Sequence, residues 1–125
     1  MAWIAYNPNP AGNPDAIDCT VRAICRVTGL DWDAVYDELT ARGKIAKIMP
    51  VSDAVWGTLL QDLGFVRHTA PNPCTSCCTV SCFAADHPRG TYLVCPYQHI
   101  CAVVDGDWYD TFDCGGNRVI FYWSR

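Results

Sequence analysis

The chain carries the three residue types that form a cysteine nucleophile site: a thiol, an imidazole and a carboxylate. Cys19 follows Asp18 at the start of a predicted amphipathic helix, where free N–H groups and the helix dipole stabilise a thiolate. His99 comes much later and opens a predicted strand, which is a rigid position for a general base. This combination predicts covalent chemistry at Cys19, with His99 moving the proton.

The acid that would orient His99 is predicted from a hairpin. Asp105-Gly106 lies between two strand-like segments and favours a two-residue type I′ loop. In that register Asp110 lies on the same face as His99 and diagonal to it, within reach of a side chain. Asp113 is the reserve acid, because a three-residue loop or a bulge would shift the register.

Each of these residues also has a purely structural interpretation. Cys19 could be one small buried residue among nine cysteines, and His99 could be a core histidine satisfied by backbone groups. Asn13 could supply a second oxyanion donor, but an Asn before Pro14 is also typical of a turn. These alternatives stay open at the level of sequence.

The surrounding pattern changes halfway along the chain, from helical spacing to strands. Gly43 and Gly64 are predicted to end the second and third helices. Three helices in the first half, followed by an antiparallel sheet with one short helix in the second half, predict an α+β domain spanning residues 1–125. The predicted helices cover about 19–27, 32–41, 53–63 and 79–86, and the predicted strands cover 65–68, 90–95, 99–104, 108–111 and 119–123.

Composition limits the classes of function. The net charge is −4, and Lys and Arg form no basic run, so a nucleic-acid partner is not expected. The chain lacks a leader-like start and an apolar stretch long enough for a membrane span, so we expect a cytoplasmic protein without a membrane partner. The odd cysteine count of nine cannot form a complete set of intrachain disulfides.

Two groups of motifs resemble small phage and bacterial proteins with a papain-like fold, which are similar in layout to the bacteriocin-processing cysteine peptidases. The resemblance leaves out roughly residues 40–78. The motifs are Asp18-Cys19-x-x-Arg22-Ala23-Ile24, Gly29-x-Asp31-Trp32-x-x-Val35-Tyr36-x-x-Leu39, Phe83-Ala84-x-Asp86-His87-Pro88-x-Gly90-Thr91-Tyr92, His99, and Asp105-Gly106-x-x-Tyr109-Asp110-Thr111.

The resemblance implies a papain-like domain, with N-terminal helices packed on the C-terminal sheet. It also implies Cys19 as nucleophile, His99 as base, Asp110 as the orienting acid and Asn13 as an oxyanion candidate. The papain layout keeps Asp113 as the alternative acid.

The function expected from these residues is thiol hydrolysis of an amide or isopeptide bond in a peptide or protein substrate, with no cofactor. Two other functions stay open. One is acyl transfer on the same site, as in transglutaminase-like enzymes. The other is a non-catalytic phage-encoded binding module that sequesters a host protein or a small ligand.

A cysteine cluster lies outside the resemblance. Cys74, Cys77 and Cys82, together with His87 or His68, could complete a tetrahedral zinc site. The spacing to Cys82 is not that of a second zinc knuckle. A cysteine-rich loop with reduced thiols is therefore the alternative.

Overall fold

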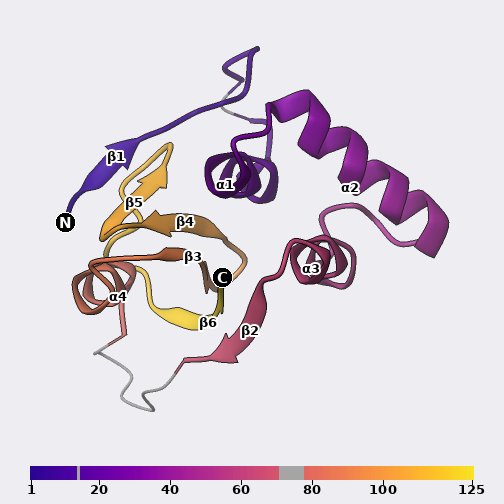
Figure 1. The fold of residues 1–125 in the computed structure, drawn as a ribbon. Helices are drawn as coiled ribbons and strands as arrows, with labels where there is room; N and C mark the ends of the chain where they lie inside the picture. Colours follow the sequence, from indigo (N-terminus) through magenta and orange to yellow (C-terminus); the bar gives the residue numbers. More distant parts are fainter. Residues whose placement is uncertain (14, 71–77) are drawn as a thin grey trace.

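The computed structural model describes residues 1–13, 15–70 and 78–125. Within them, helices and strands form an α+β architecture built on one six-stranded sheet, in the order β1-β5-β4-β3-β6-β2 (Figure 1). The helices are α1 (Cys19–Thr28), α2 (Trp32–Ala46), α3 (Asp53–Asp62) and α4 (Val80–Asp86). The strands are β1 (Trp3–Ala5), β2 (Val66–Thr69), β3 (Thr91–Pro96), β4 (Cys101–Val104), β5 (Asp107–Asp110) and β6 (Val119–Ser124).

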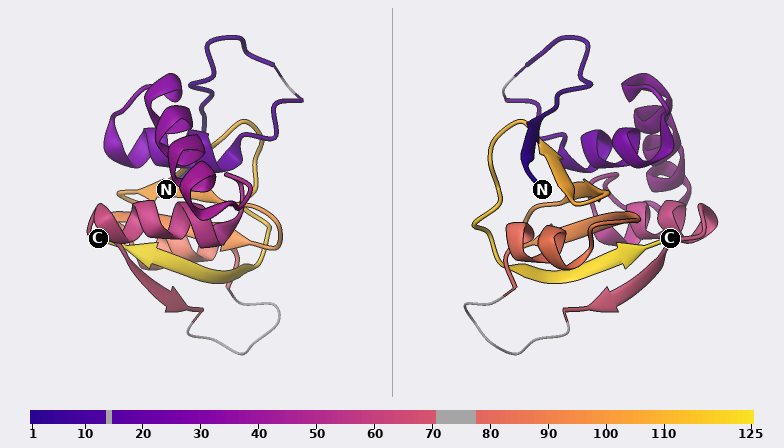
Figure 2. Two further views of the ribbon diagram at one scale, coloured as in Figure 1. Left: turned by 90° about the vertical axis from the view of Figure 1, so that its right-hand side faces the viewer. Right: turned by 60° about the vertical axis from the view of Figure 1, so that its left-hand side comes forward.

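The sheet separates two apolar clusters because successive side chains of a strand point to opposite faces. On β3, Leu93 and Cys95 pack with the first three helices, whereas Val94 packs with α4. On β4, Ala102 likewise faces the first cluster and Val103 the second. The helices α1, α2 and α3 thus cover one face of the sheet and α4 covers the other (Figure 2).

The sheet is mixed, and the prediction of an antiparallel sheet was wrong at one edge. The segment Trp3–Ala5 pairs in parallel with β5, placing Ala5 opposite Asp110. This strand has three residues, all exposed, so no alternation of apolar and polar side chains marks it in the sequence.

The hairpin prediction was confirmed. Val104 pairs with Asp107 and Val103 with Trp108, and both loop residues have positive φ, 50° at Asp105 and 83° at Gly106. These are the backbone angles of a type I′ turn. The register carries Asp110 to the end of β5, next to the start of β4.

The second helix is longer than predicted, because Gly43 does not end it. The helix continues to Ala46 and closes at Lys47 in the left-handed conformation. A Cβ on Gly43 would lie 2.7 Å from the carbonyl oxygen of Ile48. Glycine is therefore required at this position by the close return of the chain, and its role is packing rather than termination.

Among the described residues, no helix combines the length and the apolar character that crossing a membrane requires.

Candidate active site

Cys19 is the first residue of α1, and the capping arrangement there is unusual. Asp18 occupies the N-cap position, but its carboxylate makes no capping hydrogen bond. It accepts instead from Trp32 Nε1 at 2.8 Å, from Asn9 Nδ2 at 3.1 Å and from Arg22. Because the carboxylate is held elsewhere, no side chain in the described part of the structure caps the first N–H groups of α1. Such groups favour an anion beside Cys19.

His99 is positioned by the turn between β3 and β4. Its N–H donates to the Pro96 carbonyl at 3.2 Å, and Gln98 before it has a left-handed φ of 52°. The ring Nε2 lies 2.5 Å from Asp110 Oδ2. Since Asp110 occupies Nε2, the other ring nitrogen, Nδ1, is the one left to exchange a proton with Cys19.

Asp110 is almost fully buried, with 2% exposure, and both of its oxygens are used. Oδ2 meets His99, while Oδ1 accepts from the Thr111 N–H at 2.8 Å and from Arg22 Nη2 at 3.0 Å. Burial by itself would raise the pKa of Asp110, but the hydrogen bonds and charges of His99, Thr111 and Arg22 lower it. Asp110 is therefore a carboxylate that fixes the ring of His99.

Cys19 and His99 shift each other toward the charged forms. Burial would raise the pKa of the Cys19 thiol, yet the hydrogen bond and charge of His99, the Ile100 N–H and the Arg22 charge lower it. Burial would lower the pKa of His99, yet its contacts with Asp110, Cys114 and Cys19 raise it to about 11. A thiolate beside an imidazolium is the reactive state of a cysteine nucleophile.

The pair is open to a ligand. Cys19 and His99 both line a cavity of about 540 Å³. Its wall is mostly apolar and comes from the segment before α1, the start of α3, the β3–β4 turn and β6: Ile17, Val51, Trp56, Pro96, Ile100 and Phe121. A substrate carbonyl could therefore reach the thiol from solvent.

The structure distinguishes Asp110 from Asp113, the two acids that the sequence left as candidates for orienting His99. Asp110 meets His99, whereas Asp113 Oδ1 accepts from Trp108 Nε1 and from the Gly115 N–H, both at 2.9 Å. Asp113 therefore stabilises the loop after β5 and does not contact the imidazole.

Asn13 was predicted as an oxyanion donor, and the structure places it elsewhere. Its Oδ1 accepts from the Asp15 N–H at 2.9 Å in an exposed turn. It does not line the cavity of Cys19. The turn interpretation of Asn13 is the one that the geometry supports, and the free N–H groups of α1 are nearer candidates for an oxyanion.

Two residues at this site were not assigned a firm role from sequence. Arg22 bridges Asp18 and Asp110; its spacing of four residues from Asp18 is the signal that could have indicated a pair. Cys114 follows β5 in a loop and is fully buried. Nothing in the sequence around it indicates that it meets His99.

Cys114 belongs to a buried polar cluster. Donor atoms of His99, Asp110 and Cys114 lie within 4.8 Å of one another, and the Cys114 and Cys101 sulfurs are 3.5 Å apart. Hydrogen bonds from Cys101 and His99 lower the pKa of Cys114 to about 7 against the effects of burial and of Asp110. These residue types could hold a metal ion, but His99 Nε2 and both Asp110 oxygens are already engaged in hydrogen bonds.

The zinc site predicted near the cysteine cluster gains no support from its described members. Cys74 and Cys77 lie outside the described residues. Cys82 is exposed on α4, and His87 places Nδ1 2.8 Å from the Phe83 carbonyl while stacking on the Phe83 ring. His68 pairs with Ser124 at 2.7 Å. Both histidines thus have structural contacts.

Comparison of the chain with known protein families, with curated proteins and with solved structures finds no match.

Proposed function

We propose that this chain is a papain-like cysteine hydrolase that cleaves an amide or isopeptide bond, with Cys19 as nucleophile, His99 as acid and base, and Asp110 as the orienting carboxylate. The observation that carries the proposal is the position of His99. One ring nitrogen is fixed by a buried carboxylate at 2.5 Å, and the hydrogen bond and charge of the ring lower the pKa of a thiol at a helix start without a side-chain cap.

The chemistry follows from these contacts. The Cys19 thiolate attacks the substrate carbonyl carbon, and the oxygen, now negatively charged, lies toward the free N–H groups at the start of α1. The His99 imidazolium gives its proton to the leaving amine as the carbon–nitrogen bond breaks, which leaves a thioester on Cys19. Neutral His99 then removes a proton from water, and the hydroxide displaces the thiolate to release the acid.

An activated ester tests this proposal without knowledge of the natural substrate. Wild-type protein incubated with p-nitrophenyl acetate should release nitrophenolate and carry an acetyl group on Cys19, located by peptide mapping. Cys19→Ala should abolish the acylation, and His99→Ala should slow it by about two to four orders of magnitude.

The matched control is Cys82→Ala, because Cys82 is an exposed thiol on α4 outside the cavity. The Cys82→Ala variant should be acylated at Cys19 at the same rate as the wild type. An acetyl group that maps to Cys82, or release that continues unchanged in Cys19→Ala, would contradict the proposed function.

A further inference from the structure

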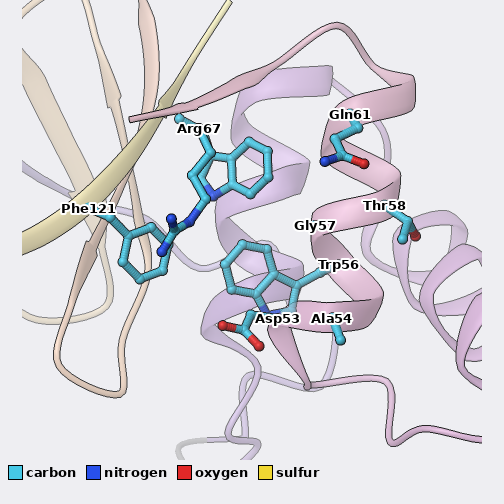
Figure 3. Close-up of a pocket in the computed structure, with 9 residues that line it drawn as sticks. Asp53, Ala54, Trp56, Gly57, Thr58, Gln61, Arg67 and Phe121 are labelled. Carbon is cyan, nitrogen blue, oxygen red and sulfur yellow. The ribbon is translucent and has the colours of Figure 1, made fainter. Parts of the chain in front are cut away.

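The cavity of Cys19 and His99 does not end at the reactive pair. Asp53, Trp56 and Phe121 line it, and the same three residues also line a second cavity of about 320 Å³ (Figure 3). The two cavities therefore adjoin at these residues, and together they make a depression that extends from Cys19 along the start of α3 to β2. We call it the α3 groove.

The middle of the α3 groove is lined by apolar rings, and the apolar side chains at its Cys19 end are open to solvent. Trp56 and Phe121 form the shared wall. Ile17 and Val51, at the end near Cys19, are 85% and 64% exposed. Side chains of this kind gain free energy when an apolar group covers them.

The far end of the groove presents a fixed positive charge. Arg67 on β2 points toward Phe121 (Figure 3), and its guanidinium carbon lies 4.2 Å from the centre of that ring. In the part of the chain that the structure describes, no carboxylate lies within ion-pair distance of Arg67. A guanidinium held by an aromatic ring and lacking an anion is suited to bind a carboxylate.

Asp53 is the acidic side chain that lines both cavities, and it lies between the Cys19–His99 pair and Arg67. It is the first residue of α3, where the helix dipole stabilises a carboxylate. Arg67 is the cation at the far end of the groove, and among the described residues it has no ion pair, so the complementary ligand at that end is acidic.

We propose that the α3 groove binds an extended peptide segment of the substrate, with an apolar side chain against Trp56 and Phe121 and an acidic side chain paired with Arg67. This inference rests on the proposed function, because the reactive end of the groove is Cys19. It adds a substrate class: peptides that carry an apolar and an acidic residue on one side of the bond to be cleaved.

Binding to an inactive protein tests the groove separately from catalysis. A random hexapeptide library is passed over immobilised Cys19→Ala protein, and the retained peptides are sequenced. Peptides that combine Asp or Glu with Phe, Trp, Leu or Ile should be enriched. The double variant C19A/R67E should retain peptides with Lys or Arg instead, and C19A/R67Q should lose the acidic preference without gaining a basic one.

The matched control is C19A/R89E, which changes an exposed arginine in the turn after α4, outside both cavities. It should select the same peptides as Cys19→Ala alone. A synthetic peptide from the enriched set should bind about ten- to a hundredfold more weakly to C19A/R67E than to C19A/R89E. Circular dichroism of each variant confirms the fold.

The outcomes separate the two proposals. An absence of enrichment, or an acidic preference that persists in both Arg67 variants, overturns the groove inference even if wild-type Cys19 is acylated by the ester. Enriched peptides that bind through Arg67 but are never cleaved by the wild type support the groove, and they count against the hydrolase.

Discussion

Arg22 Nη2 lies 3.0 Å from Asp110 Oδ1, so the helix that carries the thiol also holds the acid that orients the imidazole. The same guanidinium binds Asp18 through Nη1. Arg22 is largely buried, with 11% of its side chain exposed. Its position couples the start of α1 to the end of β5.

Arg22→Met should therefore lower both stability and reactivity. The change leaves buried Asp18 without a cation and removes one of the two cations at Asp110, and breaking a buried pair of this kind costs about 3–5 kcal/mol. Urea unfolding measures the loss, and the rate of Cys19 acylation should fall with it.

Arg26→Met is the matched control for Arg22→Met. Arg26 is on the same helix, but its guanidinium stacks on Tyr109 at 4.2 Å. A change of similar size in both variants would mean that Arg22 only covers apolar surface.

Cys19 should be the first thiol to react with iodoacetamide at mildly acidic pH. Its pKa is lowered by the hydrogen bond and charge of His99 against the effect of burial, and the thiolate is the species that is alkylated. The rate at Cys19 should stay high well below the pH at which an ordinary thiol ionises. His99→Gln should move this rate profile to higher pH.

Peptide mapping at a series of pH values measures that profile, with exposed Cys82 as the internal reference. Equal labelling of Cys19 and Cys82 at pH 6 would remove the basis for an activated thiol.

Asp110→Asn should slow acylation of Cys19 by about two to four orders of magnitude, because an amide cannot support the imidazolium. Asp113→Asn should leave the rate close to that of the wild type, since Asp113 contacts Trp108 and the Gly115 N–H. The two rates, measured with the same ester, decide between the acids. Loss of activity in Asp113→Asn alone would reverse the assignment.

The stability contributed by His99 should decrease as pH rises. Contacts with Asp110, Cys114 and Cys19 outweigh burial and raise the folded-state pKa to about 11, whereas the unfolded value is about 6.5. The contribution is complete below the unfolded value, and it is lost progressively as pH rises toward the folded value.

Cys19 has the opposite linkage, because its lowered pKa adds stability as pH rises. The measurement is therefore made in a Cys19→Ala background, comparing urea unfolding with and without His99→Gln from pH 6 to 10. The difference between the two variants should shrink toward high pH. A difference that is constant or grows would show that His99 is not held as a cation.

The hairpin and its consequence for the site could be predicted from the sequence, because Asp105-Gly106 is a local signal that sets the register of both strands. The placement of Asp110 beside His99 followed from that register. The contact of Cys114 with His99 and the shared wall at Trp56 and Phe121 depend on how distant segments pack. The edge strand β1 pairs with a strand far along the chain, and its short exposed segment carries no periodic signal.

The division of the site between α1 and the β4–β5 hairpin also has a kinetic consequence. The helix packs on β3, β4 and β5, which come much later in the chain, so the catalytic contacts join segments far apart in sequence. We expect such contacts to form late during folding, because a long loop must close before they add stability. The enhanced rate of Cys19 alkylation should therefore appear only in the last phase of refolding. Alkylation of samples taken during refolding then reports the fraction of molecules that have reached the native structure.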